Sequence, residues 1–145
     1  MGNVDATPTT PSSGLGLARI DEKKTKLSPI GDFTGSVASH AAELTGTGDG
    51  KLWGFFTTSP ASLAAIDMAT GETPKVQSLA GVDTGIGWAF SFWGGDFWFY
   101  TGTTTSSVTR LQPKKNNALN VVIDDVGFLI VGAGVSTCAP LEPPK

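Results

Sequence analysis

The stretch "SLAAIDMATGETPKVQSL", residues 62–79, has the pattern of a strand, a turn and a second strand. Leu63 and Ile66 stand in its first apolar run, and Gly71 can adopt the positive φ that a tight turn requires. A two-stranded hairpin cannot bury its own apolar side chains. The stretch therefore predicts a hairpin that belongs to a larger sheet and packs against another layer.

The composition favours strands and turns over helices. Charged residues make up 16% of the 145 residues, against about 25% in average soluble domains, and Glu and Lys, which favour surface helices, are few. The net charge of -3 provides no basic surface for nucleic acid. Because no run of about 18 apolar residues occurs, we expect no membrane span.

A repeat of about 45 residues runs through the chain, as three sets of similar segments show. These are "ARID" (18–21), "AAID" (64–67) and "TRLQ" (109–112); "GDGKLWGFFT" (48–57) and "WGGDFWFYTG" (93–102); and "IGWAFSFW" (86–93) and "VGAGVSTC" (131–138). The second set aligns Trp53 with Trp98. Three independent agreements at one spacing indicate repeated structural units.

Each repeat divides into four short strands. In the second copy, Trp88, Phe90 and Phe92 alternate with small residues, which predicts a strand with one aromatic face. The tight turn Gly94–Gly95 follows, and three more strands are predicted over 97–101, 108–111 and 118–126. Four short strands in 45 residues are typical of the blades of a β-propeller. We therefore expect an all-β fold, a propeller segment of about three blade repeats.

The repeats predict a single domain over residues 15–140. We divide the chain into a flexible polar N-terminal segment (1–14), a half blade (15–35), two blades (40–82 and 86–128), a partial blade of one inner strand (130–138) and a tail (141–145). Propellers have about four to eight blades. We therefore expect the ring to be completed by a second copy, most simply in a head-to-tail homodimer, or by the rest of a longer parent chain.

Residues 63–71, "LAAIDMATG", resemble the strand–turn motif "L-x-x-I-D-x-x-T-G" of quinoprotein-like and YncE-like β-propellers. Three longer stretches, "AELTGTGDGKLWGFF", "GWAFSFWGGDFWFYT" and "IVGAGVSTCAPLEPP", resemble uncharacterised propeller-type lipoproteins of myxobacteria. The resemblance implies the C-terminal part of an exported protein of the periplasm, outer membrane or extracellular space. The start, "MGNVDATPTTPSSG", has no signal-peptide pattern. The resemblance implies no catalytic residues.

Aromatic side chains are concentrated between residues 88 and 100. Of these, the candidates for a ligand-binding cluster are Trp88, Trp93, Trp98 and Tyr100, because flat amphipathic rings can stack on a sugar. The alternative is packing between blades, since alternation places about half of the aromatic residues on each face of a sheet. We expect Trp93 and Trp98 to be the most exposed.

No other residues predict catalysis, a metal site or a cofactor. The acidic residues of the turns come one or two at a time, whereas calcium requires six or more oxygen ligands; they are Asp49, Asp67, Asp96, Asp124 and Asp125. His40 is the only histidine and lacks a partner at ligand spacing. Cys138 is the only cysteine, and we expect a buried or inert thiol.

The sequence therefore predicts a non-catalytic structural or interaction module of the bacterial cell envelope, which binds other proteins through loops or blade edges. The alternative is a lectin-like propeller that binds a carbohydrate or another small ligand through the aromatic cluster.

Overall fold

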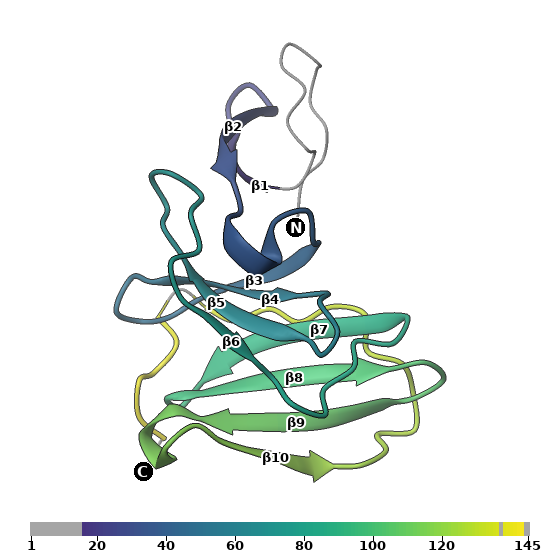
Figure 1. The fold of residues 1–145 in the computed structure, drawn as a ribbon. Coiled ribbons are helices and arrows are strands. Elements are labelled where there is room, and N and C mark those ends of the chain that lie inside the picture. Colours follow the sequence, from purple (N-terminus) through teal and green to yellow (C-terminus); the bar gives the residue numbers. More distant parts are fainter. Residues whose placement is uncertain (1–15, 137, 144–145) are drawn as a thin grey trace.

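The computed structural model describes residues 16–136 and 138–143, and this part of the chain is built from antiparallel β-strands (Figure 1). The predicted polar segment 1–14 lies outside the described residues. The strands are β1 (Gly16–Asp21), β2 (Lys26–Asp32), β3 (Ala42–Gly46), β4 (Leu52–Phe56), β5 (Ser62–Ile66), β6 (Val76–Ser78), β7 (Gly87–Trp93), β8 (Asp96–Gly102), β9 (Ser106–Gln112) and β10 (Ala118–Ile123). Two short 3-10 turns, η1 (Gly35–Val37) and η2 (Pro113–Lys115), complete the elements. The all-β prediction is confirmed.

The strands form three sheets. One contains only β1 and β2, the second has the order β3-β4-β5-β6, and the third has the order β7-β8-β9-β10. In both four-stranded sheets each strand pairs with its neighbour in sequence, so each is a simple meander. The two meanders lie within residues 40–82 and 86–128.

The two meanders share one register, 45 residues apart. Trp53 pairs with Ala65 between β4 and β5, and Trp98 pairs with Arg110 between β8 and β9. Five residue pairs join β4 to β5. Adding 45 to both residue numbers of any of them gives a pair that joins β8 to β9. The repeat in the sequence is therefore a repeat of backbone geometry, and Trp53 and Trp98 occupy equivalent positions.

The hairpin β1–β2 repeats the outer half of a meander. The side chains of Asp21 and Asp67 each accept hydrogen bonds from the backbone N–H groups two and three residues further on. A left-handed residue then closes the turn in all three copies, with φ of 51° at Thr25, 80° at Gly71 and 54° at Asn116. Thus β1–β2, β5–β6 and β9–β10 are three versions of one strand–turn–strand unit.

The β3–β6 sheet is the middle layer of a stack, between the β1–β2 hairpin and the β7–β10 sheet (Figure 1). In β5, Leu63 belongs to the core against β7–β10, and Ile66 belongs to the core against β1–β2. Phe55 of β4 is fully buried, and its ring centroid lies 5.9 Å from that of Phe90 and 4.8 Å from that of Phe99. The first strand of the hairpin predicted over residues 62–79 is therefore buried by layers on both of its faces.

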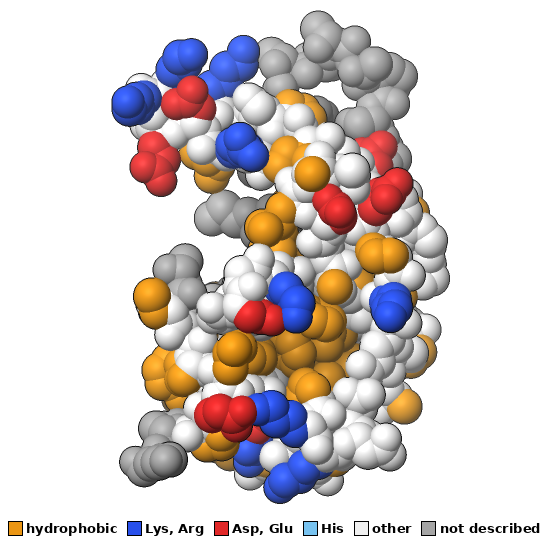
Figure 2. All heavy atoms as spheres, turned by 90° about the vertical axis from the view of Figure 1, so that its left-hand side faces the viewer, with side chains coloured by type: hydrophobic (Ala, Val, Ile, Leu, Met, Phe, Trp, Pro, Cys, Tyr) orange, Lys and Arg blue, Asp and Glu red, His pale blue; other side chains and the backbone are white. Residues whose placement is uncertain are grey.

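The molecular surface reflects these layers. Figure 2 shows charged side chains gathered at the upper end, where the β1–β2 hairpin projects, and a hydrophobic patch in the lower half with further charged side chains around it. The hairpin turn carries Asp21, Glu22, Lys23, Lys24 and Lys26. This charged turn is solvated, and the apolar contacts lie between the sheets.

The predicted inner strand over residues 130–138 does not form, and the described part of this segment is irregular. An isolated strand has no partner for its backbone hydrogen bonds, and Gly132 and Gly134 weaken any strand further. The connection between β10 and this segment nevertheless resembles the connection between β6 and β7. Ala61 exchanges backbone hydrogen bonds of 2.8 and 3.0 Å with residues 79–82, and Ser106 does so over 2.9 and 3.0 Å with residues 126–128. The described part of the chain thus enters a further repeat without forming its sheet.

Candidate functional site

One face of the β7–β10 sheet points away from the β3–β6 sheet, and we call it the open face. Paired and alternate residues share a face of a sheet, which assigns to the open face Ser91, Trp93, Asp96, Trp98, Tyr100, Val108, Arg110, Asn120 and Ile123. Trp93 is 45% exposed, and Trp98 and Tyr100 are half-buried. Large aromatic side chains therefore reach solvent on this face.

A pocket of about 460 Å³ lies between the open face and the C-terminal segment. Its lining comprises Ser91, Trp93, Trp98 and Tyr100 from β7 and β8, with Ile130 and Gly132–Val135 from the segment. Three of the four aromatic residues predicted to bind a ligand thus lie together. The segment contributes backbone and small side chains, which the sequence did not associate with this site.

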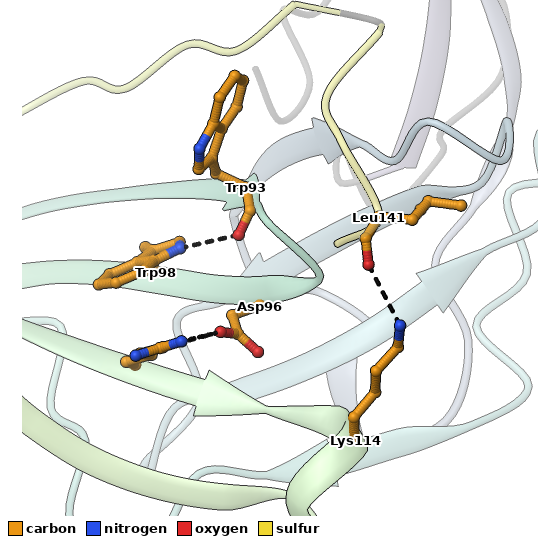
Figure 3. A network of polar contacts seen from close by, with 6 residues as sticks. Trp93, Asp96, Trp98, Lys114 and Leu141 are labelled. Carbon is orange, nitrogen blue, oxygen red and sulfur yellow. Dashed lines mark hydrogen bonds and ion pairs between the residues drawn. The ribbon is translucent and has the colours of Figure 1, made fainter. Parts of the chain in front are cut away.

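Trp98 is held in place by polar neighbours, as Figure 3 shows in part. Its indole N–H donates to the backbone oxygen of Trp93 over 3.2 Å. The Arg110 guanidinium lies 5.0 Å from the Trp98 ring centroid, a cation–π geometry. Arg110 Nε also donates to the largely buried carboxylate of Asp96 over 2.8 Å. The orientation of the indole is therefore set before any ligand or partner arrives.

A second polar contact lies in the same pocket. The hydroxyl groups of Ser91 and Tyr100 are 3.1 Å apart, and either can donate. Hydroxyl groups beside aromatic rings can exchange hydrogen bonds with a ligand or with a backbone. The pocket therefore combines apolar contact area with adaptable polar groups.

Trp88 does not belong to this cluster. It lies on the opposite face of the β7–β10 sheet, where its ring contacts that of Phe55 with centroids 6.1 Å apart. Trp88 therefore packs between the two meanders. The sequence already predicts this separation. Trp88 and Trp93 are an odd number of positions apart on one strand, so their side chains lie on opposite faces of the sheet.

A second pocket, of about 370 Å³, lies where the β3–β4 and β7–β8 turns meet the C-terminal segment. Trp53, Phe92 and Phe97 supply its aromatic wall, and its charged pairs are Asp49 with Lys51 and Lys114 with Glu142. Lys114 also donates to the backbone oxygen of Leu141 over 3.4 Å (Figure 3). No local motif marks this pocket, because four separate parts of the chain contribute to it.

Hydrogen bonds lower the pKa of two carboxyl groups in turns. The pKa of Asp49 lies below its ordinary value of 3.8 because the Lys51 ammonium and then the Thr47 hydroxyl donate to the carboxylate. The pKa of Asp67 is lowered by the backbone N–H groups of Ala69 and Thr70. Both carboxylates therefore stabilise turns.

The remaining candidates for chemistry are dispersed. Residues 16–136 and 138–143 contain no group of three or more His, Cys, Asp and Glu side chains that could hold a metal ion. The Nδ1 atom of His40 lies 3.1 Å from the backbone oxygen of Thr57. Cys138 was expected to be a buried or inert thiol; it is exposed, so the buried alternative is wrong. In the described residues no helix is long and apolar enough to cross a membrane.

The sequence matches no known family model, no curated protein and no solved structure. A function for this chain therefore has to be inferred from its own residues and their geometry.

Proposed function

We propose that this chain is a non-catalytic interaction module, built from β-propeller-type blades, that binds a further β-sheet layer across its open face. One observation carries the proposal. The side chains of the open face are the positional equivalents of those by which the β3–β6 sheet packs on the β7–β10 sheet.

The equivalence can be followed residue by residue. On the β3–β6 sheet, Phe55 is fully buried, and Trp53 lies with its ring centroid 4.9 Å from that of Phe97 in the next sheet. The residues 45 positions further on are Tyr100 and Trp98, which are half-buried. Trp53 is itself half-buried and lines the second pocket. The contrast therefore lies at the other pair, because Phe55 faces a complete sheet and Tyr100 faces a pocket.

Covering these rings provides a driving force for binding. An aromatic side chain buries roughly 150–250 Å², and removing apolar area from water is worth about 25 cal/mol per Å². At most about a third of the surface of Trp98 and of Tyr100 remains exposed, so completing their burial is worth at most about 4 kcal/mol, before the entropy cost of association. Further contacts on β9 and β10 would add to it.

The polar groups of the face suit recognition. Arg110 and Asp96 neutralise one another, and Ser91 pairs with Tyr100. Such a face can be covered without leaving an uncompensated charge. The resemblance to propeller-type lipoproteins supports a place for this module in the bacterial cell envelope.

A second candidate function is the binding of a carbohydrate or another small ligand in the pocket of about 460 Å³. The exposed Trp93 beside Trp98 and Tyr100 favours it, because sugar rings stack on such side chains. A glycan array tests it. Saccharide binding that is lost in Trp98→Ala would favour this function over sheet stacking.

The proposed function is tested by measuring mass and binding of a hydrophobic dye on the full chain. We expect the 14.9 kDa chain either to associate or to bind the dye. Trp93→Lys and Tyr100→Lys should reduce whichever signal is observed, since a lysine opposes burial of the open face.

The matched control is Val121→Lys. Val121 is 59% exposed on β10, and its partner Thr109 places it on the other face of the same sheet. It should leave the signal unchanged, and circular dichroism should show that all variants remain folded. A monodisperse wild-type monomer that binds no dye would contradict the proposal, as would equal effects of all three substitutions.

A further inference from the structure

The opposite end of the stack also carries an apolar face. The face of the β1–β2 hairpin that points away from the β3–β6 sheet comprises Ala18, Ile20, Leu27 and Pro29, which pair across the two strands. Ile20 is 57% exposed. Its equivalents in the next two repeats, Ile66 and Leu111, are 5% and 1% exposed because the preceding layer covers them. The hairpin therefore has the face that normally receives a preceding layer.

The two ends of the stack are complementary. Within the chain, one face of the β3–β6 sheet packs against the Leu111 face of the β7–β10 sheet. The open face carries the residues equivalent to that face of the β3–β6 sheet. The Ile20 face of the hairpin carries the residues equivalent to the Leu111 face. Bringing the two ends together continues the sheet–sheet interface that the chain already forms.

The space on the open face also fits a hairpin. The C-terminal segment Ile130–Val135 lies over β7 and β8, the inner half of the face. On the outer half, Ile123 of β10 is 48% exposed and the Arg110 side chain of β9 is 31% exposed. The β1–β2 hairpin is itself the outer half of a repeat. A hairpin beside the segment would complete one layer of the stack.

We infer that the open face is occupied by a second copy of this chain. The β1–β2 hairpin of each copy stacks on β9 and β10 of the other, beside that copy's segment Ile130–Val135. The contact is head-to-tail, and two such contacts close a dimer. The inference rests on the proposed function, because it names the occupant of the same open face.

The test uses one substitution at each end of the full chain, with mass measured by sedimentation velocity. Ile20→Asp changes the hairpin face, and Ile123→Asp changes the open face. Both side chains are exposed in the single chain, so both variants should fold as monomers. We expect the wild type to form dimers and each variant alone to dissociate at least tenfold more readily. Val121→Asp, on the same strand as Ile123 but the opposite face, should dimerise like the wild type.

Mixing the two variants gives the decisive result. The Ile20→Asp chain keeps an unchanged open face, and the Ile123→Asp chain keeps an unchanged hairpin, so a mixture can form one intact contact. We expect the mixture to recover a dimer that is weaker than the wild type and stronger than either variant alone.

Other outcomes separate this inference from the proposed function. A dimer that is lost in Ile123→Asp but kept in Ile20→Asp would overturn the head-to-tail arrangement and leave the open face as the binding surface. A wild-type monomer that binds dye on the open face would also overturn the second copy as occupant. A wild-type monomer that binds no dye would overturn both.

Discussion

At the scale of the residue, the turns show how little of the sequence a repeat needs to preserve. Thr25, Gly71 and Asn116 stand at equivalent positions, and all three have positive φ. Only glycine adopts this conformation without a steric cost, and asparagine tolerates it better than a β-branched residue. Gly71 has a second constraint, because a Cβ there would overlap the backbone of Gly31 in β2. This close approach joins the hairpin to the middle sheet.

Replacing Gly71 with alanine should therefore cost more than backbone strain alone. Gly71→Ala should lower the free energy of unfolding by about 3 kcal/mol, from strain at φ of 80° and from the overlap with Gly31. Gly50→Ala is the matched control, because Gly50 has φ of 78° and a Cβ added there would meet no atom within 4 Å. It should cost about 1 kcal/mol. Urea unfolding measures both, and equal losses would contradict the close approach.

At the scale of the element, the same strand position has different surroundings in the two meanders. Phe55 in β4 is enclosed by Phe90, Phe99 and Trp88 of the next sheet. Tyr100 in β8, its equivalent 45 residues on, faces a pocket and the irregular segment Ile130–Val135. The contribution that a residue at a given position of the repeat makes to the free energy of unfolding therefore depends on the layer that covers it.

This difference predicts unequal effects of equivalent substitutions. Phe55→Ala should lower the free energy of unfolding by about 3–5 kcal/mol, as expected for a buried aromatic residue. Tyr100→Ala should lower it by about 1–2 kcal/mol, because its side chain is only half-buried. The measurement is chemical unfolding at concentrations where the chain is monomeric. Equal losses would mean that a complete layer covers Tyr100 within one chain.

At the scale of the whole molecule, burial is uneven along the stack. The β3–β6 sheet has a core on each face, whereas the β1–β2 hairpin and the β7–β10 sheet each have a core on one face. Local stability follows the number of buried contacts and backbone hydrogen bonds. The middle of the stack should therefore be its most stable part.

Hydrogen exchange on the monomer checks this order. We expect the slowest exchange in β4 and β5, intermediate rates in β8 and β9, and fast exchange in β1, β2 and residues 130–136. The segment 130–136 has no strand partner, so its amides should exchange much faster than those of β7. Comparable protection of β7 and this segment would show that a fourth sheet forms in solution.

The sequence by itself determined the strands, the turns and their repetition. Strand alternation is visible in Trp88, Phe90 and Phe92, and the Asp67–Gly71 turn contains both the hydrogen-bonding carboxylate and the left-handed glycine. These features depend on residues close together in the chain. Local patterns were therefore enough to predict an all-β fold with a spacing of 45 residues.

Only the tertiary structure decided which surfaces meet. Alternation separates Trp88 from Trp98, but only packing shows that Trp88 lies against Phe55 while Trp98 lies on the open face under Arg110. The strand predicted over 130–138 has apolar residues and the right spacing, yet its described part is irregular. A strand is stabilised by hydrogen bonds to a neighbour, and whether that neighbour is present depends on the assembled layers rather than on the segment itself.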